Sequence, residues 1–212
     1  MNKYTIFEPI KNEIVIEKSH FICTLSKVHS ETEAQEFIKK KKKEYWDATH
    51  NCSAYIIGQN SVAERSSDDG EPSGTAGLPM LEVLRKNSLY DVAAVVTRYF
   101  GGIKLGAGGL IRAYTMSVAE AVKKAGLAEV IVMGHYTFLW NVADVGKILN
   151  ILYRQKLFTV EDVAYEQRAK LKLIFPVADK AKVEDWLTEA LQQKIELNEE
   201  SRYGQEQKVT KD

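Results

Sequence analysis

The sequence has few cysteines, no long apolar run and no excess of one charge, and each absence excludes a class of protein. Two cysteines, Cys23 and Cys52, in 212 residues are too few for a disulfide framework, so we expect a reducing, cytoplasmic setting. No apolar run approaches the ~20 residues of a membrane helix, and the charged N-terminus lacks the apolar core of a signal peptide. We therefore expect no membrane association. The formal net charge is zero, so any nucleic-acid binding must come from a local patch.

The apolar pattern that is present indicates an α+β protein of two domains. Residues 1–132 and 135–203 each carry a complete set of apolar strands and helices, so we expect separate cores joined by a short connection near 132–135. Residues 204–212 are polar and are predicted to form a flexible tail.

Periodicity and capping residues predict the elements of the first half. Ser30 and Glu33 form a predicted capping box for a helix, Thr75 a cap for a short helix to Leu84, and Gly126 the end of a helix that starts near Leu110. Residues 59–67 are polar and are predicted to be a mobile loop. The predicted strands cover 13–17, 21–28, 50–58 and 91–100.

The second half predicts a strand at 136–140, a helix at 144–155, strands at 158–165 and 169–176, a helix at 178–192 and a strand at 194–201. This order, β-α-β-β-α-β, is the ferredoxin-like pattern.

A glycine segment, GGIKLGAGG at 101–109, lies between a predicted buried strand and a predicted helix. Glycines let backbone N–H groups converge, and a helix N-terminus leaves free donors, so the segment favours a bound anion, most often phosphate. We expect three cations, Arg98, Lys104 and Arg112, to converge with these donors on one concave surface. The alternative is that the segment is only a tight connection between strand and helix, which needs small residues for packing. The spacing of its glycines and lysine is not that of a Walker A loop. The candidate phosphate-binding residues are Arg98, Gly101, Gly102, Lys104, Gly106, Gly108, Gly109 and Arg112.

An acidic segment, SSDDGEPSGT at 66–75, precedes the glycine segment. Its carboxylates, Asp68, Asp69 and Glu71, either brace the glycine segment through ion pairs with the three cations, or hold Mg²⁺, or bond their own backbone in turns. We favour bracing, with Asp68 or Asp69 within ion-pair reach of Arg98, Lys104 or Arg112. We therefore expect no metal and no other cofactor.

Two pairs of zinc-ligand residue types, His20 with Cys23 and His50 with Cys52, do not predict a zinc site. On a strand, His20 and Cys23 point to opposite faces, and structural zinc pairs usually lie on turns. We interpret them as satisfied histidines and small buried cysteines. No nucleophile set can be placed from the sequence, so we assign no catalytic residue and predict that the protein is not an enzyme.

Two long stretches identify a resemblance. SDDGEPSGTAG at 67–77 and VVTRYFGGIKLGAGGLIRAY at 95–114 resemble the signatures of the IMPACT family, and EKSHFI at 17–22 and ATHNCSAYIIG at 48–58 are also similar to it. The resemblance implies a first domain with a fold like domain 2 of ribosomal protein S5. It implies a second, ferredoxin-like domain similar to the last domain of elongation factor G. It implies no established catalytic activity, and eukaryotic relatives regulate translation.

Three functional hypotheses follow. The leading one is a non-enzymatic, monomeric protein that binds RNA or the ribosome and regulates translation. The second is a Mg-dependent phosphate-loop enzyme on a fold like that of small-molecule kinases, which is an analogy of fold alone. The third is an adaptor whose ferredoxin-like sheet binds a protein partner in translation control. Retention of RNA, turnover of a nucleotide, or capture of a protein without RNA distinguishes the three.

Overall fold

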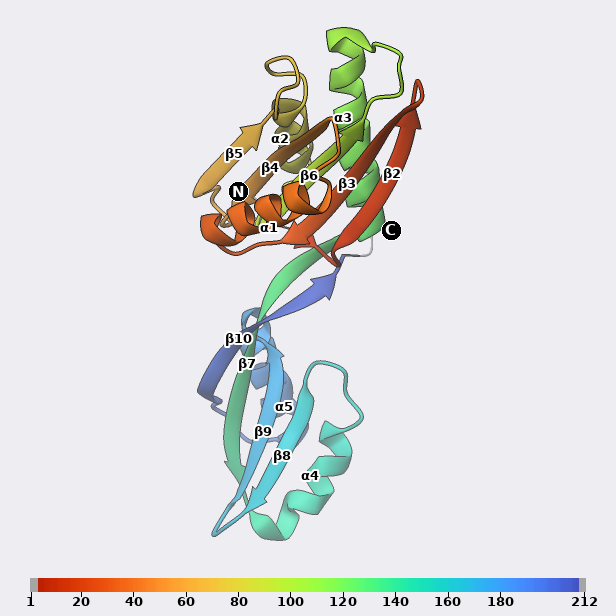
Figure 1. Cartoon of the computed structure of the whole chain (residues 1–212). Helices are drawn as coiled ribbons and strands as arrows, with labels where there is room; N and C mark the ends of the chain where they lie inside the picture. Colours follow the sequence, from red (N-terminus) through yellow and green to blue (C-terminus); the bar gives the residue numbers. More distant parts are fainter. Residues whose placement is uncertain (1–3, 210–212) are drawn as a thin grey trace. The chain divides into compact units, whose positions relative to one another are not determined.

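The computed structural model describes residues 4–209 and has a mixed α+β fold (Figure 1). The chain divides into two compact units. One is formed by the residues up to Glu129 together with those from Gln207, and the other by Val130–Glu206. Strand β7 (Leu127–Trp140) passes without interruption through the boundary predicted at 132–135, so the connection at this point is part of a strand.

The first unit is built on a five-stranded antiparallel sheet in the order β2-β3-β6-β4-β5. A short strand, β1 (Thr5–Ile6), pairs instead with Leu127 and Ala128 at the start of β7. The central strand β6 is buried along seven of its eight residues, as its apolar run predicts for a strand covered on both faces. The five strands are β2 (Ile10–Ile16), β3 (Ser19–Lys27), β6 (Val92–Tyr99), β4 (His50–Ile57) and β5 (Ala63–Ser67).

Helices cover both faces of this sheet (Figure 1). Helices α2 (Gly77–Lys86) and α3 (Gly106–Ala125) pack on one face, and α1 (Glu31–Glu44) packs on the other. Alternate residues of β6 divide between the two cores: Val96 belongs to the larger core under α2 and α3, and Ala93 to the smaller core that includes Ala34 of α1. Strand residues in phase with Val96 therefore face α3.

The start of α1 shows how local chemistry sets an element. The Ser30 hydroxyl accepts a hydrogen bond from the Glu33 backbone N–H at 3.1 Å, as a capping box predicts. The Glu33 carboxylate accepts from the backbone N–H of His29 at 2.8 Å, one residue before the position that the motif predicts. Three lysines in the last turn, Lys41, Lys42 and Lys43, lie where cations favour the helix dipole.

Several predicted elements differ from the structure, and the strand predicted at 136–140 is one of them, since it begins at Leu127. Residues 63–67 of the predicted mobile loop form β5, an edge strand whose polar side chains are half-buried or exposed. Helix α3 begins at Gly106 rather than near Leu110, because packing of its apolar face overrides the poor helix propensity of its first turn, GAGG. Residues 204–208 of the predicted tail belong to β10 (Asn198–Lys208), which pairs with β7, and Val209 donates to the Leu127 carbonyl at 2.8 Å. Residues 210–212 lie outside the described part of the chain.

The second unit has the element order β-α-β-β-α-β and the sheet order β10-β7-β9-β8, which is the ferredoxin-like arrangement. The elements after β7 are α4 (Val145–Leu152), β8 (Thr159–Tyr165), β9 (Ala169–Pro176) and α5 (Lys180–Leu191). Its core includes the stacked rings of Tyr136 and Phe175, with centroids 4.3 Å apart, and Leu187 of α5. Within residues 4–209, no helix is both long and apolar enough to cross a membrane.

Candidate anion-binding site

Three side chains from neighbouring strands meet at one end of the first sheet. Arg98 near the end of β6 is directly opposite Phe21 of β3 and His50 of β4. All three are in phase with Val96, so they face α3. Arg98 is only 5% exposed, and its guanidinium carbon lies 5.4 Å from the Phe21 ring centroid and 5.6 Å from that of Phe100. The sheet thus carries a buried cation close to two aromatic rings.

A buried carboxylate, Glu71, balances this cation. Nη1 of Arg98 donates to Oε1 of Glu71 at 2.6 Å, and the Tyr114 hydroxyl of α3 donates to the same oxygen at 2.8 Å. The second oxygen, Oε2, lies 3.8 Å from Nε2 of His50. Burial raises the pKa of the Tyr114 hydroxyl far above its ordinary value, with further contributions from Cys52 and Glu71, so this hydroxyl remains a donor to Glu71.

The loop that delivers Glu71 is held by the two aspartates before it. Asp68 accepts from the backbone N–H groups of Gly74, Ala76 and Gly77 at 2.7–3.0 Å, so it caps α2 in place of the predicted Thr75. Burial alone would raise the pKa of Asp68, but these three hydrogen bonds lower it below its ordinary value.

Asp69 adopts a left-handed backbone conformation with φ of 47°. Its hydrogen-bond partners lie outside the glycine segment. Its carboxylate accepts from the backbone N–H of Asn51 at 2.6 Å and from the amino group of Lys42. Its carbonyl oxygen accepts from Nδ1 of His50 at 2.8 Å. Because that bond occupies Nδ1, the other ring nitrogen of His50, Nε2, faces Glu71.

The glycine segment gives α3 an open N-terminus. A Cβ atom on Gly101 would lie 2.0 Å from the carbonyl carbon of Lys18, so only glycine allows the chain to pass this close to the β2–β3 turn. Gly102 has φ of +86° and Gly106 of +66°. Helix α3 has no side-chain cap at Leu105, so the backbone donors of its first turn are available to a ligand.

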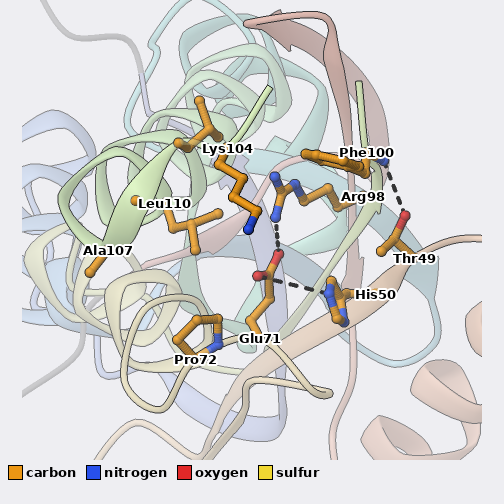
Figure 2. Close-up of a pocket in the computed structure, with 11 residues that line it drawn as sticks. Thr49, His50, Glu71, Pro72, Arg98, Phe100, Lys104, Ala107 and Leu110 are labelled. Atoms are coloured by element: carbon orange, nitrogen blue, oxygen red, sulfur yellow. Dashed lines mark hydrogen bonds and ion pairs between the residues drawn. The ribbon is translucent and has the colours of Figure 1, made fainter. Parts of the chain in front are cut away.

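These elements surround a pocket of about 320 Å³, called the anion pocket below (Figure 2). The amino group of Lys104 and the guanidinium of Arg98 enter it near the Glu71 carboxylate. Nε of Arg98 is buried and has no hydrogen-bond partner in the described structure, although a buried donor normally has one. The pocket is lined by Thr49, His50, Glu71, Arg98 and Lys104 and by the less polar Pro72, Phe100, Leu105, Gly106, Ala107 and Leu110.

The predicted site residues are only partly brought together. Arg98, Lys104 and Gly106 line the anion pocket, while Arg112 and Gly109 line a second hollow on which Lys104 also borders. The prediction that all three cations converge on one concave surface is therefore wrong for Arg112, which lies more than one turn into α3. Among the other predicted residues, Gly101 packs against Lys18, and Gly102 and Gly108 have open space where a Cβ atom would be.

The bracing prediction also needs correction. Asp68 and Asp69 bind backbone N–H groups and Lys42 rather than Arg98, Lys104 or Arg112, because turns at this point direct both carboxylates toward α2 and β4. The carboxylate that pairs with Arg98 is Glu71. The aspartates on which the magnesium hypothesis depended are thus engaged within the protein. Across residues 4–209, no group of three or more His, Cys, Asp or Glu side chains is arranged to hold a metal ion.

Three residues of the site, His50, Phe21 and Tyr114, are not indicated by any motif in the sequence. The sequence predicts His50 as a satisfied histidine and gives no sign that the Tyr114 hydroxyl reaches Glu71, since the Tyr114 ring lies in the core. Their convergence depends on strand register, which brings Phe21 and His50 opposite Arg98.

Cys52 is a free, buried thiol whose pKa is raised to about 12, chiefly by burial, so it is protonated at neutral pH.

Comparison with known proteins places the chain in a family. Residues 17–122 match the Impact N-terminal domain. The IMPACT family member YvyE of Bacillus subtilis (strain 168) is 49% identical over 92% of this chain and 90% of its own length, and the family member YigZ of Escherichia coli (strain K12) is 37% identical over 66% of this chain and 74% of its own. A crystal structure described as that of a hypothetical protein is 30% identical, with a TM-score of 0.59 over 92% of this chain and 95% of that one. The chain therefore belongs to the IMPACT family.

Proposed function

We propose that this protein is a non-enzymatic, cytoplasmic RNA-binding protein that regulates translation, and that the anion pocket holds a phosphate group of the RNA backbone. The observation that carries the proposal is the buried Arg98, with an unpartnered Nε, beside Lys104 and the uncapped N-terminus of α3. Free backbone donors and two cations at one pocket are the chemistry that binds phosphate. The translation setting comes from the resemblance to the IMPACT family.

The charge of the whole chain does not favour RNA, so binding must depend on this local arrangement. Formal net charge is zero, and Glu71 neutralises Arg98. The net positive charge of the pocket therefore comes from Lys104 and the dipole of α3. A volume of about 320 Å³ is at the lower end of ligand pockets, which suits one phosphate with its sugar better than a folded RNA element.

A salt titration of RNA binding by wild type and Lys104→Ala tests the proposal, with fluorescence anisotropy of a labelled single-stranded 12-mer as the readout. Removing one phosphate contact should weaken binding about fivefold at low salt. It should also make the slope of log affinity against log salt less negative by about 0.7. Lys104 is exposed, so the variant should fold normally.

Lys147→Ala is the matched control, because Lys147 of the second unit has a side chain that is 82% exposed and pairs with Asp144. It should leave both affinity and slope unchanged. Equal slopes for wild type and Lys104→Ala would show that the pocket does not contact phosphate. Capture of a protein partner without RNA would then favour the adaptor hypothesis, and turnover of ATP with Mg²⁺ would favour the enzyme hypothesis.

A further inference from the structure

A second hollow of about 380 Å³ lies beside the first turns of α3. Lys104 and Leu105 line both hollows, so the two hollows adjoin and share these residues as a wall. Two hollows that share a wall suit a ligand that crosses the wall.

The second hollow offers contacts of three kinds. Arg112 supplies a cation, and neither Arg112 nor Lys104 has a hydrogen-bond or ion-pair partner among residues 4–209. Ile103 and Met116 are large apolar side chains that are 40% and 46% exposed. Glu17 at the β2–β3 turn also lines the hollow, and its carboxylate can accept hydrogen bonds. Cation, apolar surface and acceptor match the phosphate, the base face and the hydroxyl or amino groups of a nucleotide.

The position of Arg112 fits a ligand that continues from the anion pocket. Arg112 follows Gly106 by six residues, which is about 9 Å along the helix axis, so one short oligonucleotide can reach both. Lys104 lines both hollows, so it can contact a ligand that extends from one hollow into the other. A second copy of this chain or an apolar peptide would leave Arg112 and Lys104 without an anion, which costs free energy when the surface is desolvated.

We propose that the second hollow binds the neighbouring nucleotide of the same RNA strand whose phosphate occupies the anion pocket, with Arg112 contacting the next phosphate and Met116 and Ile103 contacting the base. This inference rests on the proposed function and makes the site an extended, two-nucleotide site. It therefore predicts that an oligonucleotide long enough to reach both hollows binds more tightly than a single nucleotide, and that residues of the second hollow contribute to this gain in affinity.

The test compares UMP with the tetranucleotide UUUU, using wild type, Lys104→Ala and the double variant Arg112→Ala/Met116→Ala, with NMR chemical-shift titration as the readout. The double variant should weaken binding of UUUU about tenfold and leave binding of UMP within twofold of wild type. Lys104→Ala should weaken both ligands. A matched control is the double variant Ile111→Ala/Lys123→Ala, which removes an apolar side chain that is 41% exposed and an exposed cation of the same helix, neither of them lining the two hollows. It should bind both ligands as wild type does.

The outcomes separate this inference from the proposed function. If Lys104→Ala weakens both ligands and the Arg112→Ala/Met116→Ala variant binds UUUU like wild type, the second subsite is wrong while the anion pocket stands. If Lys104→Ala also binds both ligands like wild type, the proposed function itself is overturned. A loss of UMP binding in the double variant would show that Arg112 acts on the first pocket, which contradicts the two-nucleotide site.

Discussion

The buried pair of Arg98 and Glu71 makes Glu71→Ala the most informative single substitution in the first unit. The two side chains are 7% and 3% exposed, so little water can solvate the guanidinium once its partner is removed. Breaking a buried ion pair from one side costs about 3–5 kcal/mol of unfolding free energy, and Arg98 already has one unpartnered donor. For a unit of this size, about 4 kcal/mol corresponds to a fall in melting temperature of roughly 10–15 °C.

Thermal and urea unfolding followed by circular dichroism measure this effect against two further variants. Glu64→Ala removes the carboxylate of a more exposed pair, in which the Arg85 side chain is 43% exposed, and should cost about 1 kcal/mol or less. Replacing both members of the buried pair, Glu71→Met with Arg98→Met, should recover at least half of the loss, because no buried charge is then left unpaired. The reasoning is refuted if Glu71→Ala is no less stable than Glu64→Ala. It is also refuted if the double variant is as unstable as the single one.

Much of the fold could be predicted from the sequence because its signals are local. The Ser30 cap of α1 and the buried run of β6 depend on residues close together in the chain. The two main errors in the first unit have a common cause, since both concern polar or glycine-rich stretches whose structure is imposed by packing. Strand β5 forms because β4 offers an unpaired edge, and the GAGG turn of α3 is helical because the helix that follows it is buried.

The candidate site was less predictable because its partners are far apart in the sequence. Arg98 and Glu71 are separated by 27 positions, and Tyr114 and Glu71 by 43. The sequence indicated that acidic residues lie near the glycine segment but could not show which carboxylate reaches Arg98. The choice depends on backbone turns: the left-handed conformation of Asp69 and the capping bonds of Asp68 direct those two side chains away and leave Glu71 to enter the pocket.

Two further predictions concern the loops that hold the site, both measured by unfolding. Gly101→Ala should destabilise the first unit by several kcal/mol, on the order of other severe steric substitutions, because its Cβ would meet the Lys18 backbone at 2.0 Å. Gly108→Ala, with open space at its Cβ position, should instead be neutral or stabilising by up to about 1 kcal/mol.

The Asp68 cap should make the stability of the first unit depend on pH. The pKa of the Asp68 carboxyl is lower in the folded than in the unfolded chain. Its contribution to the free energy of unfolding is therefore fully present above the unfolded pKa of about 3.9, and it is lost as pH falls through the folded pKa. Asp68→Ala should therefore cost about 1–2 kcal/mol at pH 7, and its deficit relative to wild type should shrink below about pH 4. Asp68→Asn keeps one acceptor oxygen without the titrating charge, so its stability at neutral pH should lie between that of wild type and that of Asp68→Ala. A deficit of Asp68→Ala that stays constant from pH 7 to pH 3 would show that the ionised carboxylate is not what caps α2.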